Sequence, residues 1–166
     1  SEISGVTISN FLRTAVNNLR EKKGLAVYPV VDFHKLLKEK MAQLKIDSSF
    51  SKRYLNEGFS GGEKKRMEML QLAMLEPKYG ILDEPDSGTD VDALKIIAEG
   101  INQIKDSRET GFLLITHYNK ILKSIVPDEV IILINGKVAR VGDATLAEDI
   151  ESTGYEKYIS KEGGTP

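Results

Sequence analysis

The chain has 166 residues, 40% hydrophobic and 29% charged, a composition typical of one soluble folded domain with an apolar core. Its 23 basic and 25 acidic residues nearly cancel, so no strong overall field favours nucleic acid or an anionic membrane as a partner. Without cysteine, with two distant histidines and with no apolar run near the roughly 18 residues of a spanning helix, the sequence predicts a cytoplasmic protein without disulfides, a histidine-based metal cluster or membrane insertion.

The first third of the sequence is predicted to be purely helical. Apolar residues recur there at helical spacing in two stretches, which predicts two amphipathic helices joined by a loop through Gly24 and Pro29. The first stripe consists of Ile8, Leu12, Ala15, Val16 and Leu19, and the second of Phe33, Leu36, Leu37, Met41 and Leu44.

From Tyr79 onward the pattern changes to alternating strand and helix. Residues 79–82 and 112–115 are predicted strands, and the segment between them is a predicted helix with Asp90 as its N-cap. The apolar face of that helix carries Leu94, Ile97, Ala98, Ile101 and Ile104. Because parallel strands need a crossover helix, this order predicts a parallel sheet and an α/β fold.

A hairpin is predicted in the last third. Residues 129–134 form a predicted strand, and Asn135-Gly136 is a strong turn signal before a second strand at 137–141. A short helix and a loose tail are expected at the C-terminus.

Ser60, Gly61 and Gly62 form the first candidate for a binding site. Two glycines after a serine allow close approach of a ligand to the backbone, and the helix predicted from about Glu63 would direct free amides at an anion such as phosphate. The alternative is an ordinary N-cap and turn at the start of that helix.

Asp83 and Glu84, which follow the first predicted strand, are the second candidate. Ligands of open α/β sheets gather at the carboxyl ends of the strands, so these acids are placed where a nucleotide would lie. Asp83 is predicted to hold Mg²⁺ through water, and Glu84 to polarise the water that attacks a γ-phosphate. Alternatively, the two acids only cap the next turn.

His117, within Thr116-His117-Tyr118, follows the second predicted strand and is the third candidate. A neutral imidazole can accept a hydrogen bond at one nitrogen and donate from the other, which suits a γ-phosphate sensor. A lone histidine in this position is also compatible with a purely structural role. The glycine turn, the acid pair and the histidine occur in one order, each at the end of a predicted element, which favours a shared function.

These residues together resemble the ABC ATPase family over nearly the whole chain. Phe59 to Glu63 is similar to the signature motif of the family, and Tyr79 to Asp83 to its Walker B strand. Glu84 resembles the catalytic glutamate, Ser87 to Asp90 the D-loop, and His117 the H-loop switch.

The resemblance implies an incomplete RecA-like parallel-sheet lobe with an α-helical subdomain and a C-terminal β-hairpin. Residues 1–76 would form the helical subdomain with the signature motif, and residues 77–166 the C-terminal part of the α/β lobe. The implied cofactors are ATP and Mg²⁺. Glu84 and His117 would be catalytic, Asp83 would serve the metal, and Ser60, Gly61, Gly62, Glu63 and Asp90 would contact nucleotide bound by a second copy of the subunit.

A narrower similarity is to SufC-type ATPases of iron–sulfur cluster assembly. It rests on Gly58 to Arg66, Leu75-Glu76-Pro77, Asp83 to Lys95 and Thr116-His117-Tyr118. Transporter subunits usually carry Gln in place of Glu63 and Ala-Leu in place of Gly88-Thr89. This similarity implies SufB- and SufD-type scaffold proteins as partners.

Two other functions remain open from the sequence. One is the nucleotide-binding subunit of an importer, with a helical region that docks on a membrane permease. The other is a non-catalytic module that binds a partner through the helical face between Ile3 and Leu44.

The sequence lacks one expected motif. No stretch has two glycines in P-loop spacing followed by Lys and Ser or Thr, the motif that cradles the β- and γ-phosphates. The chain is therefore expected to be a C-terminal fragment of a longer ATPase and to be inactive by itself.

Overall fold

The computed structural model describes residues 2–108, 110–117 and 120–159. The chain divides into two compact units, one ending at Thr116 and the other beginning at His117. The predicted division at 76/77 separates functional segments and stays a prediction. The boundary between the two compact units lies further along the chain, because the helices before and after residue 76 pack together.

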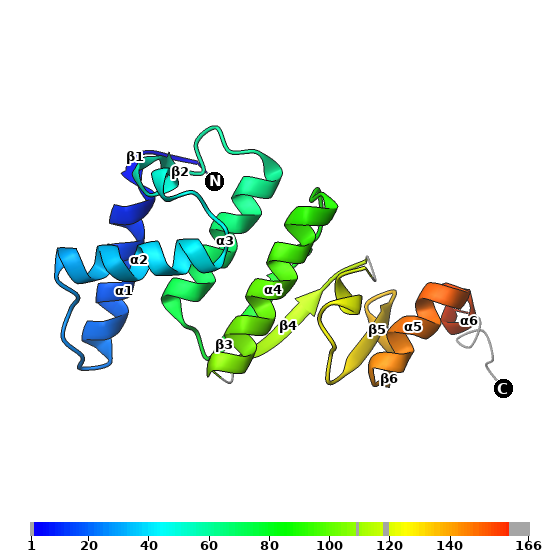
Figure 1. Ribbon diagram of the computed structural model, residues 1–166. Helices are drawn as coiled ribbons and strands as arrows, with labels where there is room; N and C mark the ends of the chain where they lie inside the picture. The colour runs from blue at the N-terminus through cyan, green and yellow to red at the C-terminus, as the bar shows by residue number, and fades with distance from the viewer. Residues whose placement is uncertain (1, 109, 118–119, 160–166) are drawn as a thin grey trace. The chain divides into compact units, whose positions relative to one another are not determined.

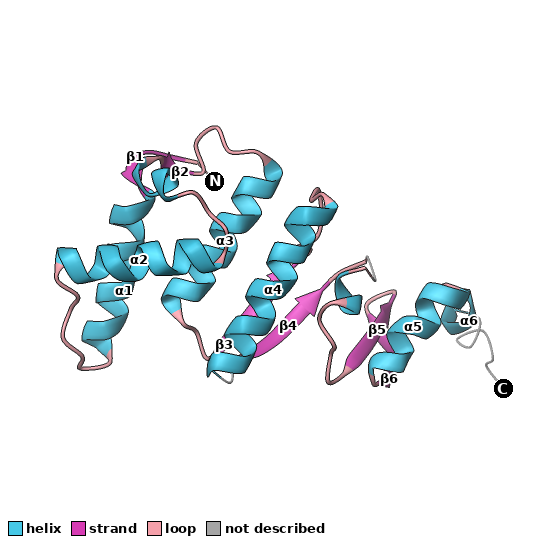
Figure 2. Ribbon diagram, in the orientation of Figure 1, coloured by secondary structure: helices cyan, strands magenta, loops and turns pink. Residues whose placement is uncertain are grey.

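The described residues of the first unit form four α-helices, one 3-10 helix and two pairs of strands. Figures 1 and 2 show their arrangement. In chain order its elements are β1 (Ile3–Thr7), α1 (Ile8–Lys22), α2 (Val30–Gln43), the 3-10 helix η1 (Ser48–Lys52), β2 (Tyr54–Leu55), α3 (Gly61–Leu75), β3 (Tyr79–Asp83), α4 (Val91–Arg108) and β4 (Gly111–Ile115).

The two predicted amphipathic helices are confirmed as α1 and α2. Their buried apolar residues are Ile8, Leu12 and Val16 in α1 and Phe33, Leu37 and Met41 in α2. Thr7 caps α1 by accepting a hydrogen bond from the Asn10 amide at 3.2 Å. Both helices contact α3, so the three helices form one packed layer.

The prediction of a purely helical first third was wrong. β1 pairs antiparallel with β2, with Ile3 opposite Leu55 and Thr7 opposite Tyr54. The strands are too short and too exposed to produce a readable alternation, because β2 has two residues and only Leu55 of the four paired residues is buried. Gly5 at φ +81° further breaks the strand pattern of β1.

The predicted parallel sheet is confirmed for β3 and β4. Their register runs from Tyr79 opposite Gly111 to Asp83 opposite Ile115. One face is closely packed, since a Cβ on Gly80 would lie 2.8 Å from the Phe112 ring and 3.5 Å from Leu72 of α3. On the other face Tyr79 and Ile81 are each 72% exposed.

The helix α4 connects the two parallel strands, as predicted. Ala93, Ile97, Ala98 and Ile101 are buried along it, and α4 lies beside α3 (Figure 1). The end of α2 also reaches α4, because a Cβ on Gly100 would lie 2.9 Å from Leu44. The helical layer is thus continuous with the sheet within the first unit.

The second unit contains the predicted hairpin. Its elements are the 3-10 helix η2 (Ile121–Lys123), β5 (Val130–Ile134), β6 (Lys137–Gly142), α5 (Ala144–Thr153) and α6 (Glu156–Ile159). Asn135 and Gly136 have φ values of 51° and 76°, as a tight hairpin turn requires. Ile132, Leu146 and Ile150 form a small core between the hairpin and α5. The predicted short C-terminal helix is thus confirmed, as α5 and α6, and the tail beyond Ile159 lies outside the described residues.

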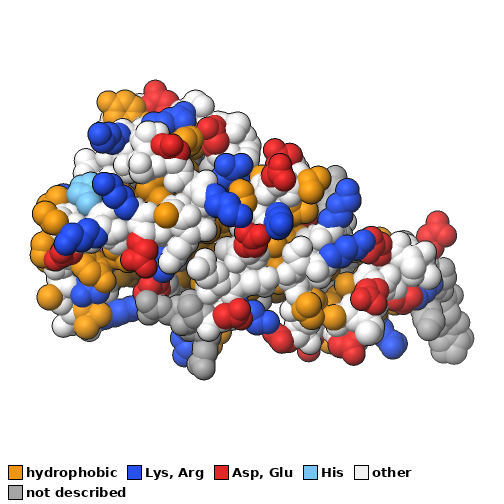
Figure 3. Space-filling view, in the orientation of Figure 1, with side chains coloured by type: hydrophobic (Ala, Val, Ile, Leu, Met, Phe, Trp, Pro, Cys, Tyr) orange, Lys and Arg blue, Asp and Glu red, His pale blue; other side chains and the backbone are white. Residues whose placement is uncertain are grey.

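The surface is mixed in charge, with acidic and basic side chains interspersed over the face seen in Figure 3. No helix among residues 2–108, 110–117 and 120–159 is long and apolar enough to cross a bilayer.

Candidate functional site

Ser60 ends the loop that leads into α3 and caps the helix. Its hydroxyl accepts a hydrogen bond from the Glu63 amide at 3.2 Å, and the Ser60 amide donates to the Glu63 carboxylate at 2.7 Å. This reciprocal pair is a capping box. The interpretation of Ser60 as an N-cap is therefore confirmed, and any role in ligand binding must coexist with it.

The capping box still leaves donors at the start of α3. Ser60 Oγ accepts from Glu63, so its own O–H remains able to donate to a ligand. The amides of Gly61 and Gly62 belong to the first helical turn, where no preceding turn offers them a carbonyl. These groups, together with the helix dipole, can bind an anion.

Neither Gly61 nor Gly62 is required by the fold of this chain. Neither has a positive φ, and an added Cβ would meet Gly88 O at 3.5 Å or Ala93 Cβ at 3.8 Å, both ordinary contacts. Glycine at a helix start nevertheless costs conformational entropy. A requirement for glycine here would come from a group outside the chain that approaches this backbone.

The same contacts bring two of the predicted site segments together. Gly61 lies beside Gly88, and Gly62 beside Ala93 at the start of α4. The predicted signature turn and the predicted D-loop are thus neighbours within the first unit.

Arg53, which the sequence reasoning did not single out, supports the loop before Ser60. Its guanidinium carbon lies 4.6 Å from the ring centre of Phe50 and 4.2 Å from that of Phe59. Its Nη2 donates to the carbonyls of Glu57 and Gly58 at 3.4 Å, and Nη1 lies 3.6 Å from Glu63 Oε1. An arginine between two phenylalanines in a loop was the one local signal for this cluster.

The pKa of Glu63 is lowered from its ordinary value. The largest cause is the hydrogen bond from the Ser60 amide, followed by that with the Ser60 side chain, and Arg53 and Arg66 contribute through their charge. Glu63 therefore remains a carboxylate at neutral pH, at the N-terminus of α3.

Asp83 and Glu84 lie at the carboxyl end of β3, as predicted, and both are exposed. Glu84 has φ 46°, an uncommon conformation for a residue other than glycine, and its amide donates to Ile115 O at 2.8 Å. This bond fixes the turn after β3 to the end of β4. The acid pair therefore lies at the carboxyl end of the two-stranded sheet and is exposed to solvent.

The turn after the acid pair is held by Asp86, which the sequence reasoning quoted only as part of a motif. Asp86 is buried, and its Oδ2 accepts from Thr116 Oγ1 at 2.8 Å, which joins the ends of β3 and β4. Its carbonyl accepts from Thr89 Oγ1 at 2.7 Å. Asp90 accepts from the Ala93 amide at 2.7 Å, so its predicted role as the N-cap of α4 is confirmed.

His117 is exposed and directly follows Thr116 after β4, where the sequence placed it, as the first residue of the second unit. Its neighbour Tyr118 lies outside the described residues. The predicted role of His117 at a γ-phosphate stays a prediction.

Comparison with known proteins identifies relatives over nearly the whole chain. "Probable ATP-dependent transporter SufC" of Escherichia coli is 46% identical over 154 residues, which cover 93% of this chain and 62% of the relative. "Probable ATP-dependent transporter ycf16" of Cyanophora paradoxa is 48% identical over 155 residues, 93% of this chain and 60% of the relative. Over nearly its whole length the chain is thus similar to ABC-type ATPase subunits.

Solved structures agree with this assignment at the level of the fold. The bacterial ABC transporter cassette MJ0796 matches with a TM-score of 0.71 at 16% identity, over 87% of this chain and 59% of that one. An ATP-binding subunit of an ABC transporter matches with a TM-score of 0.69 at 23% identity, over 97% and 64%. No family model matches the chain. The chain spans about three fifths of the length of the curated relatives it matches.

The donor set at the carboxyl end of β3 fits one class of metal ion. Within the part of the chain that the structure describes, no group of three or more His, Cys, Asp or Glu could cage an ion. Mg²⁺ keeps several waters and takes only one or two carboxylates. An exposed Asp83 beside Glu84 therefore fits Mg²⁺ shared with a nucleotide, and does not fit a dedicated protein cage.

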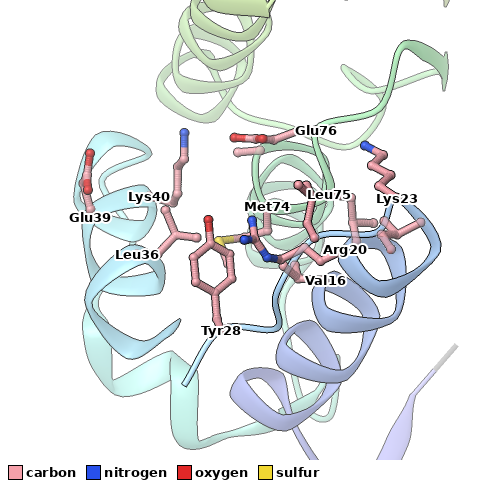
Figure 4. A pocket seen from close by; sticks show the side chains of 13 residues that line it. Val16, Arg20, Lys23, Tyr28, Leu36, Glu39, Lys40, Met74, Leu75 and Glu76 are labelled. Atoms are coloured by element: carbon pink, nitrogen blue, oxygen red, sulfur yellow. The ribbon is translucent and has the colours of Figure 1, made fainter. Parts of the chain in front are cut away.

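One cavity of the described chain lies away from these residues. It has a volume of about 270 Å³ and is lined by α1, α2, the loop between them and the end of α3. Figure 4 shows Tyr28 standing among Leu36, Met74 and Arg20, whose guanidinium lies 3.9 Å from the Tyr28 ring centre. No predicted site residue lines it, so its chemistry is separate from that of the glycine turn and the acid pair.

Proposed function

We propose that this chain supplies the signature turn, the acid pair and the switch histidine of a Mg²⁺-dependent ATPase. The observation that carries the proposal concerns Gly61 and Gly62. The chain has room for a side chain at both positions, so its own fold does not explain why both are glycine. A nucleotide phosphate held by a second copy of the ATPase is the group that would approach this backbone. The dimeric state named for the MJ0796 cassette supports such an arrangement.

The reaction is the attack of water on the γ-phosphorus of ATP. A bond forms between the water oxygen and phosphorus, and the bond from phosphorus to the β–γ bridging oxygen breaks, giving ADP and phosphate. Glu84 accepts a hydrogen bond from the water and orients it, and His117 binds the γ-phosphate. Ser60, Gly61 and Gly62 donate to the phosphates of the nucleotide in the other subunit. Glu63 holds this backbone through the Ser60 amide, and Asp90 caps the neighbouring helix α4 beside the nucleotide. Asp83 would hold Mg²⁺ through water, and the ion supplies charge neutralisation.

The first experiment replaces Glu84 by Gln in the full-length ATPase that contains this chain. Loss of the water-orienting carboxylate is expected to lower the rate of ATP hydrolysis by about 10²- to 10⁴-fold. Glu99→Gln is the matched control, because Glu99 is an exposed glutamate of α4 paired with Lys45 and should leave the rate unchanged. Hydrolysis is measured as phosphate release with Mg²⁺ present.

An equal rate for Glu84→Gln and the unchanged protein would remove Glu84 from the mechanism. The isolated 166-residue chain is expected to release almost no phosphate, because no P-loop motif occurs in it. Substantial turnover by the isolated chain would contradict the assignment of half a site to it.

We further propose that the intact ATPase acts in the cytoplasm, on SufB- and SufD-type scaffold proteins of iron–sulfur cluster assembly. Support comes from the relative named SufC and from Glu63 and Gly88-Thr89, which differ from the residues usual in transporter subunits. Affinity purification of the tagged full-length ATPase tests this. Scaffold proteins carrying an iron–sulfur cluster are expected in the eluate.

The second candidate is the nucleotide-binding subunit of a transporter. The word "transporter" in the names of several relatives favours it. Co-purification with a membrane permease instead of the scaffold proteins would establish this candidate in place of the first.

A further inference from the structure

Glu63 places a carboxylate at the start of α3, where the proposed function also places a phosphate of the nucleotide. Glu63 is the third residue of α3, and its carboxylate lies 2.7 Å from the Ser60 amide. A carboxylate there is favourable for the helix, because it interacts well with the positive end of the helix dipole. It is unfavourable for a nucleotide, because two negative groups near the same amides repel each other.

Arg53 forms an ion pair with this carboxylate. Nη1 of Arg53 lies 3.6 Å from Glu63 Oε1, while the other oxygen, Oε2, accepts from Ser60. The two oxygens of Glu63 therefore have separate partners, one for the helix cap and one for charge compensation. The side chains of Arg53 and Glu63 are 38% and 31% exposed, so water screens the pair only in part.

The position of the guanidinium is fixed from several sides. Phe50 and Phe59 contact it at 4.6 and 4.2 Å, and their own rings meet edge to face with centres 5.2 Å apart. The carbonyls of Glu57 and Gly58 accept from Nη2 across a loop in which Asn56 and Gly58 have left-handed backbone. A planar, forked cation suits these contacts better than a lysine would.

We propose that Arg53 is a positioning residue that compensates the charge of Glu63, so that a signature turn ending in Glu accepts the phosphates of a nucleotide. The inference rests on the proposed function, because it assigns the phosphate site to Ser60, Gly61 and Gly62. Arg53 acts through Glu63 and the loop. It does not itself contact the nucleotide.

A double-mutant cycle in the full-length ATPase tests the proposal. Arg53→Met removes the charge but keeps an unbranched side chain that can pack between the two rings. It is expected to raise KM for ATP about fivefold, the effect of about 1 kcal/mol from one half-exposed ion pair, with little change in kcat. In a Glu63→Gln background, where no charge needs compensation, Arg53→Met is expected to change KM by less than about twofold.

Two further measurements sharpen the cycle. Arg53→Lys keeps the charge without the forked guanidinium, so its KM is expected to lie close to that of the unchanged protein. The rise in KM caused by Arg53→Met should become smaller as the salt concentration is raised. Lys45→Met, which breaks the exposed pair with Glu99 in the same unit, is the control and should leave KM unchanged.

If Arg53→Met raised KM for ATP equally with Glu63 in place and in the Glu63→Gln background, the proposal would be overturned. Arg53 would then have a purely structural role in the loop. Failure of the proposed function gives a different result, namely a full-length protein whose ATP hydrolysis is absent or insensitive to Glu84→Gln. The pairing itself can be measured in the 166-residue chain, where Arg53→Met should raise the pKa of Glu63 in a carbon-13 NMR titration. An unchanged pKa would contradict the pairing.

Discussion

The side chain of Glu63 has two roles at the start of α3. It completes the capping box with Ser60, and it places a negative charge at the start of α3. The hydrogen bonds to Ser60 favour the charged form and so lower the pKa of Glu63. The cap therefore depends on pH in a direction that follows from the sign of the shift.

Acid is expected to open the cap below the ordinary glutamate pKa of 4.5. Because the pKa of Glu63 is lower in the folded chain than in the unfolded one, the stabilisation is fully present above pH 4.5 and is lost as pH falls through the folded pKa. The amide chemical shift of Ser60, followed by NMR, should change with a midpoint below 4.5. Glu63→Gln should abolish this transition, and a midpoint at or above 4.5 would contradict the capping geometry.

At the scale of single residues, the sequence predicted the helix caps, which depend on residues close together in the chain. Asp90 as an N-cap and Ser60 before a helix follow from residues three positions apart, and both occur in the structure. Arg53 and Asp86 could not be predicted in the same way. Asp86 meets Thr116 thirty residues later, and the importance of Arg53 depends on a loop that brings Phe50 next to Phe59.

The helices and strands were predictable to the degree that they bury an extended stripe or face. α1 and α2 each present apolar residues at helical spacing, and β3 and β4 are runs of apolar residues connected by a helix. β1 and β2 bury too little to leave such a pattern. Their pairing depends on contacts made only after the chain has folded.

Gly80→Ala is expected to destabilise the sheet. An added methyl would lie 2.8 and 2.9 Å from two carbons of the Phe112 ring, so the ring must shift within a packed layer. We expect a decrease in the free energy of unfolding of about 1 to 3 kcal/mol, measured by urea denaturation.

Gly62→Ala is the matched control for this substitution. The added methyl would meet only Ala93 Cβ at 3.8 Å, and alanine is favoured over glycine in a helix. Its free energy of unfolding should be unchanged or slightly increased. Equal effects of the two substitutions would show that Gly80 is not closely packed against Phe112.

On the scale of the whole molecule, the chain exposes one apolar face of its parallel sheet. Ile81 and Leu113 are register partners and are 72% and 53% exposed, and Ile115 on the same face is 47% exposed. Parallel sheets are normally covered on both faces. A contiguous exposed face of this kind favours association between molecules.

The isolated chain is therefore expected to self-associate through this face. Replacing Ile81 and Leu113 together by Thr places β-branched side chains, which suit strands, at both positions and removes much of the apolar surface. Sedimentation velocity should show a smaller fraction of associated chains for this variant than for the unchanged protein. Val31→Thr, at a residue of α2 that is 65% exposed, is the control, and an equal decrease with both variants would argue against the sheet face.

The first amide of α1 is hydrogen-bonded to Arg53, the residue that supports the loop before Ser60. Ile8 N donates to the carbonyl of Arg53 at 3.0 Å, one residue before β2 pairs with the end of β1. The main chain that bears the guanidinium is thus tied to the segment that leads into α1. A protein that binds and displaces that segment would therefore also displace Arg53, through this hydrogen bond and through the pairing of β1 with β2.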